Sequence, residues 1–173
     1  GIKIAARSEA GFVYAAQTLK DLFLPGGRSV YAGYVDDFPA FVFRGVLEGG
    51  YDVWNHENRV NILKWLADVK FNAFIYGPKE DPYFRRQWRR LYPPAILENF
   101  RTYLKICDEN NVFFSYALSP AMSMEYSNPA ELEKLIAKYR QLQSIGVNRF
   151  GIFFDDVLPF LSTPNDRKKF KTI

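Results

Sequence analysis

Residues Val112–Leu118, VFFSYAL, form an almost continuously apolar run rich in aromatic side chains. Runs of this length and composition are typical of a strand that is buried in a sheet. Three other stretches share these properties: Val42–Leu47, Asn72–Tyr76 and Phe150–Phe154. The sequence therefore predicts four buried strands.

Amphipathic helical patterns separate these predicted strands. The first spans about Glu57–Lys70, and the second follows Pro93-Pro94. In the third, Asn128 is the N-cap, Glu131 completes a capping box and Gly146 ends the helix. Alternating strands and helices imply a parallel sheet covered by helices, the α/β class. The strand starts are 30, 40 and 38 residues apart, which suits a (β/α) barrel or a doubly wound sheet.

The first 40 residues follow a different pattern. Ile2–Ala6 has the composition of a strand, Ser8 can cap a helix over Glu9–Phe23, and Pro25-Gly26-Gly27 ends it. We interpret residues 1–40 as the end of a preceding small α/β domain with its linker, with a boundary near residue 40.

Scarce residue types exclude several functions. The single histidine, His56, and the single cysteine, Cys107, exclude an intrachain disulfide, a cysteine-rich zinc site and chemistry that needs two imidazoles. No glycine-rich phosphate loop follows a predicted strand, and no apolar run approaches the roughly 20 residues that span a bilayer. The net charge of +4 is mild, and the one basic cluster, Arg85, Arg86, Arg89 and Arg90, is best explained as a solvated helix face with Trp88 packed inward. We expect neither a nucleic-acid nor a membrane partner.

Ionisable side chains follow three of the four predicted strands. The strands deliver Glu48–Tyr51, Gly77–Asp81, Ser119-Pro120-Ala121 and Asp155-Asp156, and carboxyl ends of parallel strands share one rim. Two close carboxylates cannot both ionise cheaply, which suits acid–base catalysis. Asp155-Asp156 could equally ligate Mg²⁺ or cap the next helix.

Other polar residues have structural explanations. We expect Glu48 to be buried and hydrogen-bonded between strand ends, and His56 to lie in a first helical turn. Lys79, taken alone, would more often be a surface lysine.

Taken in order, the strand motifs resemble glycoside hydrolase family 84, which contains β-N-acetylglucosaminidases that remove O-GlcNAc from proteins and bacterial enzymes called hyaluronidases. The motifs are Arg44–Tyr51 (RGVLEGGY) with Trp54–Arg59 (WNHENR), Asn72–Tyr83 (NAFIYGPKEDPY), Tyr116–Pro120 (YALSP) and Phe150–Val157 (FGIFFDDV). The opening segment is similar to the end of the α/β domain that precedes such barrels.

The resemblance implies a (β/α)8 barrel and a retaining mechanism in which the substrate's own 2-acetamido oxygen is the nucleophile. By position, Asp155 would accept the acetamido N–H, and Asp156 would act first as acid and then as base. Gly49, Tyr51 and Lys79 would border the sugar. The substrate would be a glycan or glycoprotein that carries N-acetylglucosamine (GlcNAc), with no cofactor and no metal. Protein O-GlcNAc, hyaluronan-type glycans and mucin glycans all fit as substrates.

The chain departs from the family pattern in two ways. Gly50 stands where the family has an aromatic residue, and Asp52-Val53 replaces a Gly-x-Pro stretch. A full barrel takes about 250 residues, so we interpret residues 41–173 as the first half of the catalytic barrel, strands one to four, and expect little activity from the isolated chain. Two alternatives stay open: a non-catalytic carbohydrate-binding or scaffold module, and metal-dependent chemistry at Asp155-Asp156.

Overall fold

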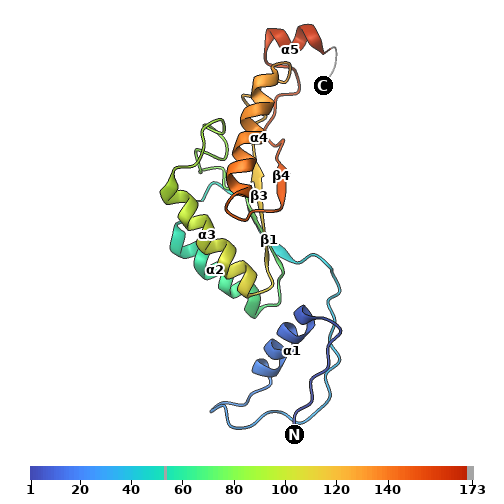
Figure 1. The fold of residues 1–173 in the computed structure, drawn as a ribbon. Helices are drawn as coiled ribbons and strands as arrows, with labels where there is room; N and C mark the ends of the chain where they lie inside the picture. The colour runs from blue at the N-terminus through green and yellow to red at the C-terminus, as the bar shows by residue number, and fades with distance from the viewer. Residues whose placement is uncertain (53, 171–173) are drawn as a thin grey trace.

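A parallel four-stranded sheet forms the centre of the molecule. The structure, a computed structural model, describes residues 1–52 and 54–170; Val53 of the Asp52-Val53 pair lies outside the described residues. The sheet contains β1 (Gly45–Glu48), β2 (Ala73–Tyr76), β3 (Phe113–Leu118) and β4 (Phe150–Ile152). All neighbours pair in parallel in the order β1-β2-β3-β4 (Figure 1). The prediction of an α/β fold with four parallel strands is confirmed.

Three helices connect the strands and cover one face of the sheet. They are α2 (His56–Asp68), α3 (Pro94–Glu109) and α4 (Pro129–Gln143), and the short α5 (Pro164–Lys169) follows β4 (Figure 1). Large side chains of the sheet and helices fill the space between them, including Leu63, Leu66, Phe74, Phe100, Phe114, Tyr116 and Leu142. None of the helices in the described ranges has the length and apolarity that crossing a membrane requires.

The other face of the sheet carries smaller and more exposed residues. Because side chains alternate along a strand, the paired Leu47, Ile75 and Ser115 lie opposite the helices. Leu47 is 52% exposed there. The described residues therefore cover this face only in part: Ala73 is buried, and Phe43 packs on Phe113.

Strand β1 begins three residues later than predicted, at Gly45 instead of Val42. The Arg44 guanidinium donates hydrogen bonds to the carbonyl oxygens of Phe41 and Val42, and the Arg44 N–H bonds the Asn72 side chain. These side-chain contacts replace the strand pairing that the apolar run Val42-Phe43 suggested.

The start of α4 also differs from the prediction. Asn128 is the N-cap, and its side chain accepts from the N–H of Ala130. Glu131 does not complete a capping box, because its carboxylate pairs with Arg89. The end of the helix is as predicted, with Gly146 at φ 111°, a left-handed conformation that glycine adopts at no steric cost.

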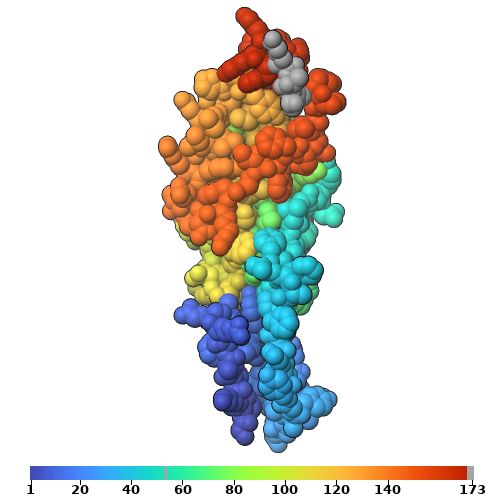
Figure 2. Space-filling model, turned by 90° about the vertical axis from the view of Figure 1, so that its right-hand side faces the viewer, coloured from blue at the N-terminus to red at the C-terminus, as the bar shows by residue number. Residues whose placement is uncertain are grey.

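Residues 1–44 form a slender extension (Figure 2). Helix α1 (Glu9–Asp21) has Ser8 as its N-cap, as predicted, and buries none of its residues. The predicted strand Ile2–Ala6 is wrong: these residues are extended without a strand partner in the described chain. Polar contacts tie the extension to the turn that follows α2, since Lys70 Nζ lies 2.6 Å from both Thr18 Oγ1 and Asp37 Oδ2.

Candidate active site at the carboxyl edge of the sheet

A lysine bridges the two adjacent aspartates that follow β4. Lys79 comes from the loop after β2, and its Nζ lies 2.9 Å from Asp155 Oδ2 and 3.0 Å from Asp156 Oδ2. The side chain of Lys79 is only 17% exposed. The ammonium group thus lies between the two carboxylates. Lys79 is therefore not the isolated surface lysine that the sequence also allowed.

Tyr51, from the loop after β1, joins the same cluster. Its hydroxyl donates to Asp156 Oδ2 over 3.3 Å, and Lys79 Nζ lies 4.9 Å from the centre of its ring. The N–H of Lys79 also donates to the Gly50 carbonyl, which joins the two loops. Gly49 lies at the same edge, directly after β1, but no described contact joins it to the aspartates.

Arg85 belongs to this site, although the sequence suggested a solvated helix face for it. The segment 82–89 forms turns instead of a helix. Trp88 packs inward as predicted and is fully buried, while the Arg85 guanidinium donates to Asp156 Oδ2 over 2.7 Å. The signal that could have found Arg85 is its place in the loop that also carries Lys79.

These cations determine the charge of Asp156. Hydrogen bonds from Arg85 and then from Lys79 lower the pKa of Asp156 to about 2, against a smaller opposing effect of burial. The same contacts with Asp155 and Asp156 raise the pKa of Lys79 above its usual value. At neutral pH the site therefore holds an ionised Asp156 and a charged Lys79.

Asp155 differs from its neighbour in its hydrogen bonding. Its Oδ2 faces Lys79, whereas its Oδ1 is buried and accepts no hydrogen bond from any residue that the structure describes. Buried polar atoms are nearly always paired in folded proteins. The Asp155 side chain is 36% exposed, so a turn of this carboxylate would present the unpaired oxygen to an N–H or O–H group of a bound molecule.

Asp156 has an unusual backbone conformation, with φ 59°. Two other non-glycine residues share the left-handed region, Lys70 and Asn111, and both lie just past the end of a helix, where this conformation is common. Asp156 follows a strand instead. Such conformations away from helix ends concentrate at functional sites, because they aim a side chain that ordinary backbone would not.

Buried polar residues support the edge of the sheet from the helix side. Glu48 is 4% exposed and pairs with Arg59 over 2.8 Å, so it is buried and hydrogen-bonded as predicted, but its partner lies on helix α2 and not at another strand end. His56 opens α2, as predicted, and its Nδ1 lies 3.0 Å from the Tyr103 hydroxyl. The Asp81 carboxylate accepts from the hydroxyls of Tyr76 and Tyr92, so the loop that carries Lys79 is anchored to the core.

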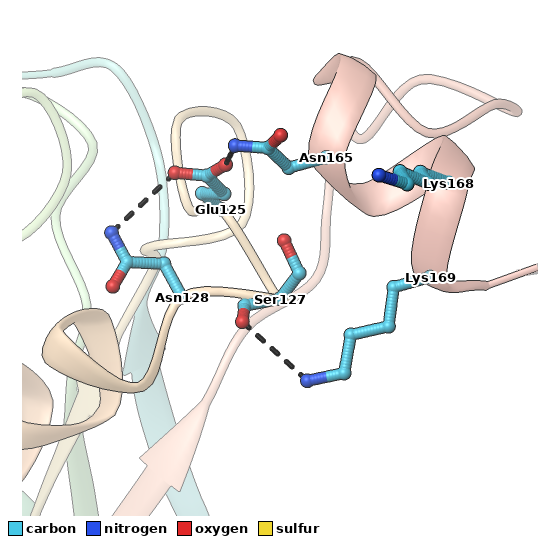
Figure 3. A pocket seen from close by; sticks show the side chains of 6 residues that line it. All are labelled: Glu125, Ser127, Asn128, Asn165, Lys168 and Lys169. Atoms are coloured by element: carbon cyan, nitrogen blue, oxygen red, sulfur yellow. Dashed lines mark hydrogen bonds between the residues drawn. The ribbon is translucent and has the colours of Figure 1, made fainter.

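A separate hollow lies between the segment 125–128 and α5 (Figure 3). Its lining residues bond one another: Asn165 Nδ2 donates to Glu125 Oε1 over 2.6 Å, and Asn128 Nδ2 donates to the other oxygen of Glu125. Next to it, the buried Asp166 accepts from the N–H groups of Tyr126 and Ser127. These contacts fasten α5 to the loop after β3.

Comparisons with known proteins show which family has this fold and sequence. The family model for β-N-acetylglucosaminidases matches residues 44–172. The protein O-GlcNAcases of Rattus norvegicus and Mus musculus are each 33% identical to the chain over 114 residues, which cover 65% of this chain and 12% of theirs. The chain thus spans about an eighth of the length of these relatives.

Two solved structures resemble the fold. A mutant O-GlcNAc hydrolase of Thermobaculum terrenum has a TM-score of 0.74 and 35% identity, covering 77% of this chain and 29% of that one. CpGH84B has a TM-score of 0.82 and 31% identity, covering 95% of this chain and 31% of that one. The likeness identifies the sheet as part of a (β/α)8 barrel, as predicted. The chain therefore belongs to the β-N-acetylglucosaminidase family, glycoside hydrolase family 84.

Proposed function

We propose that the protein hydrolyses terminal β-linked GlcNAc with retention of configuration, using the acetamido oxygen of the substrate as the nucleophile. In this proposal residues 41–173 are the first half of the catalytic barrel, and residues 1–40 end a preceding α/β domain. The chain then supplies the two reacting carboxylates, and further parts of the barrel complete the sugar pocket. The substrate is a glycan or glycoprotein that ends in GlcNAc.

One observation carries this proposal: the buried Asp155 Oδ1 without a donor among the described residues. A GlcNAc acetamido group has one N–H, and a hydrogen bond from it to Asp155 would satisfy that oxygen once the partly exposed side chain turns it toward the sugar. The bond would turn the acetamido oxygen toward the anomeric carbon. It would also stabilise the positive charge that develops on the acetamido group as the oxazoline ring closes.

Asp156 then carries the proton through both steps. In the first step the acetamido oxygen bonds the anomeric carbon, the glycosidic C–O bond breaks, and the leaving oxygen takes the proton of the Asp156 carboxyl. In the second step Asp156 takes a proton from water, the water oxygen bonds the anomeric carbon, and the oxazoline opens. The acetamido group and Asp156–H are regenerated.

The first step needs a protonated Asp156, while its pKa is about 2 with Arg85 and Lys79 bound to it. A sugar over the site removes water from the carboxylate, which favours the neutral form. The sugar hydroxyls also offer Lys79 new acceptors, which weakens its bond to Asp156. Binding of substrate thus raises the pKa of the acid that the reaction uses.

Lys79, Tyr51 and Gly49 are the proposed sugar-binding residues. Lys79 and Tyr51 contact the aspartates directly, so their side chains border any molecule that contacts Asp155. Gly49 offers backbone groups at the end of β1, where an added Cβ would contact only the Leu47 side chain, at 3.5 Å.

The test uses the complete enzyme that contains this chain, with aryl β-GlcNAc substrates whose acetamido group carries zero to three fluorines. Fluorines weaken the acetamido nucleophile, so kcat/KM falls steeply along the series, and proton NMR shows the β-anomer as the first product. Asp155→Asn lowers kcat/KM on the order of a hundredfold or more. Asp36→Asn, an exposed residue of the extension, is the matched control.

Two results would contradict the proposal. Rates that do not change with fluorination would exclude the acetamido group as nucleophile. Binding of GlcNAc by the complete protein without any turnover would favour the alternative, a non-catalytic carbohydrate-binding module on the same fold.

A further inference from the structure

We propose that Arg85 is a positioning residue for Asp156: it holds one oxygen of the carboxylate in place and leaves the other free to exchange the proton. This inference rests on the proposed function, because it concerns the acid that the proposed reaction uses. It assigns a role to a residue in the loop after β2 that does not itself contact the reacting atoms.

Three donors converge on the same oxygen of Asp156. Arg85 lies 2.7 Å, Lys79 3.0 Å and the Tyr51 hydroxyl 3.3 Å from Oδ2. No described residue donates to Oδ1. The carboxylate is therefore held from one side, and its second oxygen is the one available to a glycosidic oxygen or a water molecule.

Arg85 is the donor whose own position is fixed. Its side chain is 9% exposed, against 17% for Lys79, while Tyr51 is 63% exposed. Its guanidinium also donates to Met122 Sδ, which lies 2.7 Å from Nη2 and 3.1 Å from Nε. A thioether is a weak acceptor, and the Tyr51 hydroxyl also interacts with this guanidinium, so among the described residues Asp156 is the one anionic group that pairs with this nearly buried cation.

Arg85 and Lys79 have different relations to the aspartates. Lys79 is shared between Asp155 and Asp156, and when it passes to a sugar hydroxyl Asp156 keeps its bond from Arg85, while Asp155 depends on the acetamido N–H of the substrate. Arg85 contacts Asp156 alone. The bond from Arg85 therefore keeps the carboxylate oriented while Lys79 changes partners.

The experiment compares two aryl β-GlcNAc substrates in the complete enzyme. A 2,4-dinitrophenyl group leaves without a proton, whereas a phenyl group needs one. If Arg85 positions the acid, Arg85→Met lowers kcat/KM for the phenyl substrate at least tenfold more than for the dinitrophenyl substrate, in the same direction as Asp156→Asn. Arg85→Lys restores part of the phenyl activity, since a cation that can reach Oδ2 returns.

The neighbouring Arg86 gives the matched control. Its side chain is 68% exposed and contacts Glu80 at 4.0 Å, so Arg86→Met leaves both rates unchanged. Equal losses on both substrates in Arg85→Met, without rescue by Arg85→Lys, would show a purely structural role and overturn the inference. Should Arg85→Met fail to fold, Arg85→Gln replaces it: a loss selective for the phenyl substrate supports positioning, and a wild-type ratio of the two rates overturns the inference.

The proposed function fails in a different way. If Asp156→Asn hydrolyses both substrates at wild-type rates, Asp156 is not the acid, and the role of Arg85 falls with it. If Asp156→Asn is selective for the dinitrophenyl substrate but Arg85→Met behaves as wild type, only the inference about Arg85 is wrong.

Discussion

Lys79 Nζ lies 2.9 Å from Asp155 Oδ2, a contact that joins the loop after β2 to the residue pair after β4. The same nitrogen reaches Asp156, so one ammonium group offsets the repulsion between two adjacent carboxylates. Without the Lys79 ammonium group, Arg85 is the one remaining described cation that pairs with either carboxylate, through Asp156.

Lys79→Met is expected to raise KM for aryl β-GlcNAc and to lower kcat/KM on the order of ten- to a thousandfold. A hydrogen bond to a charged group contributes about 1.5–3 kcal/mol, and the loss is larger here because both carboxylates bond the same ammonium group. It also raises the pKa of Asp156, because the Lys79 hydrogen bond lowers it. Steady-state kinetics against pH measure both effects. Lys105→Met, on the exposed side of α3, is the control, and equal kinetics for the two variants would contradict the assignment.

Lys138 gives a prediction about stability and pH. It is fully buried on α4, its Nζ donates to the Tyr83 carbonyl over 3.0 Å, and burial lowers its pKa to about 8. The unfolded chain keeps a lysine pKa of about 10.4, so between pH 8 and 10 the unfolded state binds more protons. Stability from this group therefore rises with pH across that window, by up to about 3 kcal/mol.

Lys138→Met is expected to raise the apparent Tm at neutral pH and to remove this rise between pH 8 and 10. Burial raises the pKa values of Tyr76, Tyr92 and Tyr116 above the usual range, so these groups stay neutral through the window. Thermal unfolding followed by circular dichroism at several pH values measures the effect. Lys134→Met, on the exposed side of the same helix, should keep the wild-type slope.

The Glu48–Arg59 pair provides a test of buried charge. Arg59→Met leaves Glu48 charged and nearly buried without its partner, and the expected loss is about 3–5 kcal/mol of unfolding free energy. The exposed pair Arg101–Glu98 is the comparison, since Arg101→Met should cost at most about 1 kcal/mol. Chemical denaturation of both variants measures the difference, and similar losses would mean that the Glu48 pair is solvated.

Gly45 tests how closely β1 and β2 approach. A Cβ at Gly45 would lie 2.5 Å from Ala73 Cβ, so Gly45→Ala forces the strands apart and is expected to cost about 1–3 kcal/mol. Gly151→Ala, in β4, would place its Cβ 3.8 Å from Ala117 Cβ, an ordinary contact, and should change stability little. Matched Tm measurements of the two variants test this difference, and equal losses would contradict it.

Much of this architecture follows from local pattern. The strand Asn72–Tyr76 and the helix that ends before Gly146 were predictable because a buried strand and an amphipathic helix leave periodic signatures. The start of β1 was not, because Arg44 bonds carbonyl oxygens that pairing would otherwise use. The prediction of a strand at Ile2–Ala6 was wrong because a strand needs a partner to pair with, and the composition of a segment does not show whether one is present.

The candidate site was predictable at the strand ends and not beyond them. Tyr51, Lys79, Asp155 and Asp156 meet because parallel strands bring their following loops together. Arg85 reaches the site through the turns of residues 82–89, and Glu131 leaves its own helix end for Arg89. Both outcomes depend on long-range partners that no local spacing reveals.

The strand order β1-β2-β3-β4 has a consequence for how the chain is made. Strands β2, β3 and β4 each pair with the strand synthesised just before them, so this part of the sheet can grow one strand at a time as the chain leaves the ribosome. Lys79 follows β2 and is therefore synthesised two strands earlier than Asp155 and Asp156, which follow β4. During synthesis the two aspartates therefore join the site only when β4 docks, and they meet cations that are already in place.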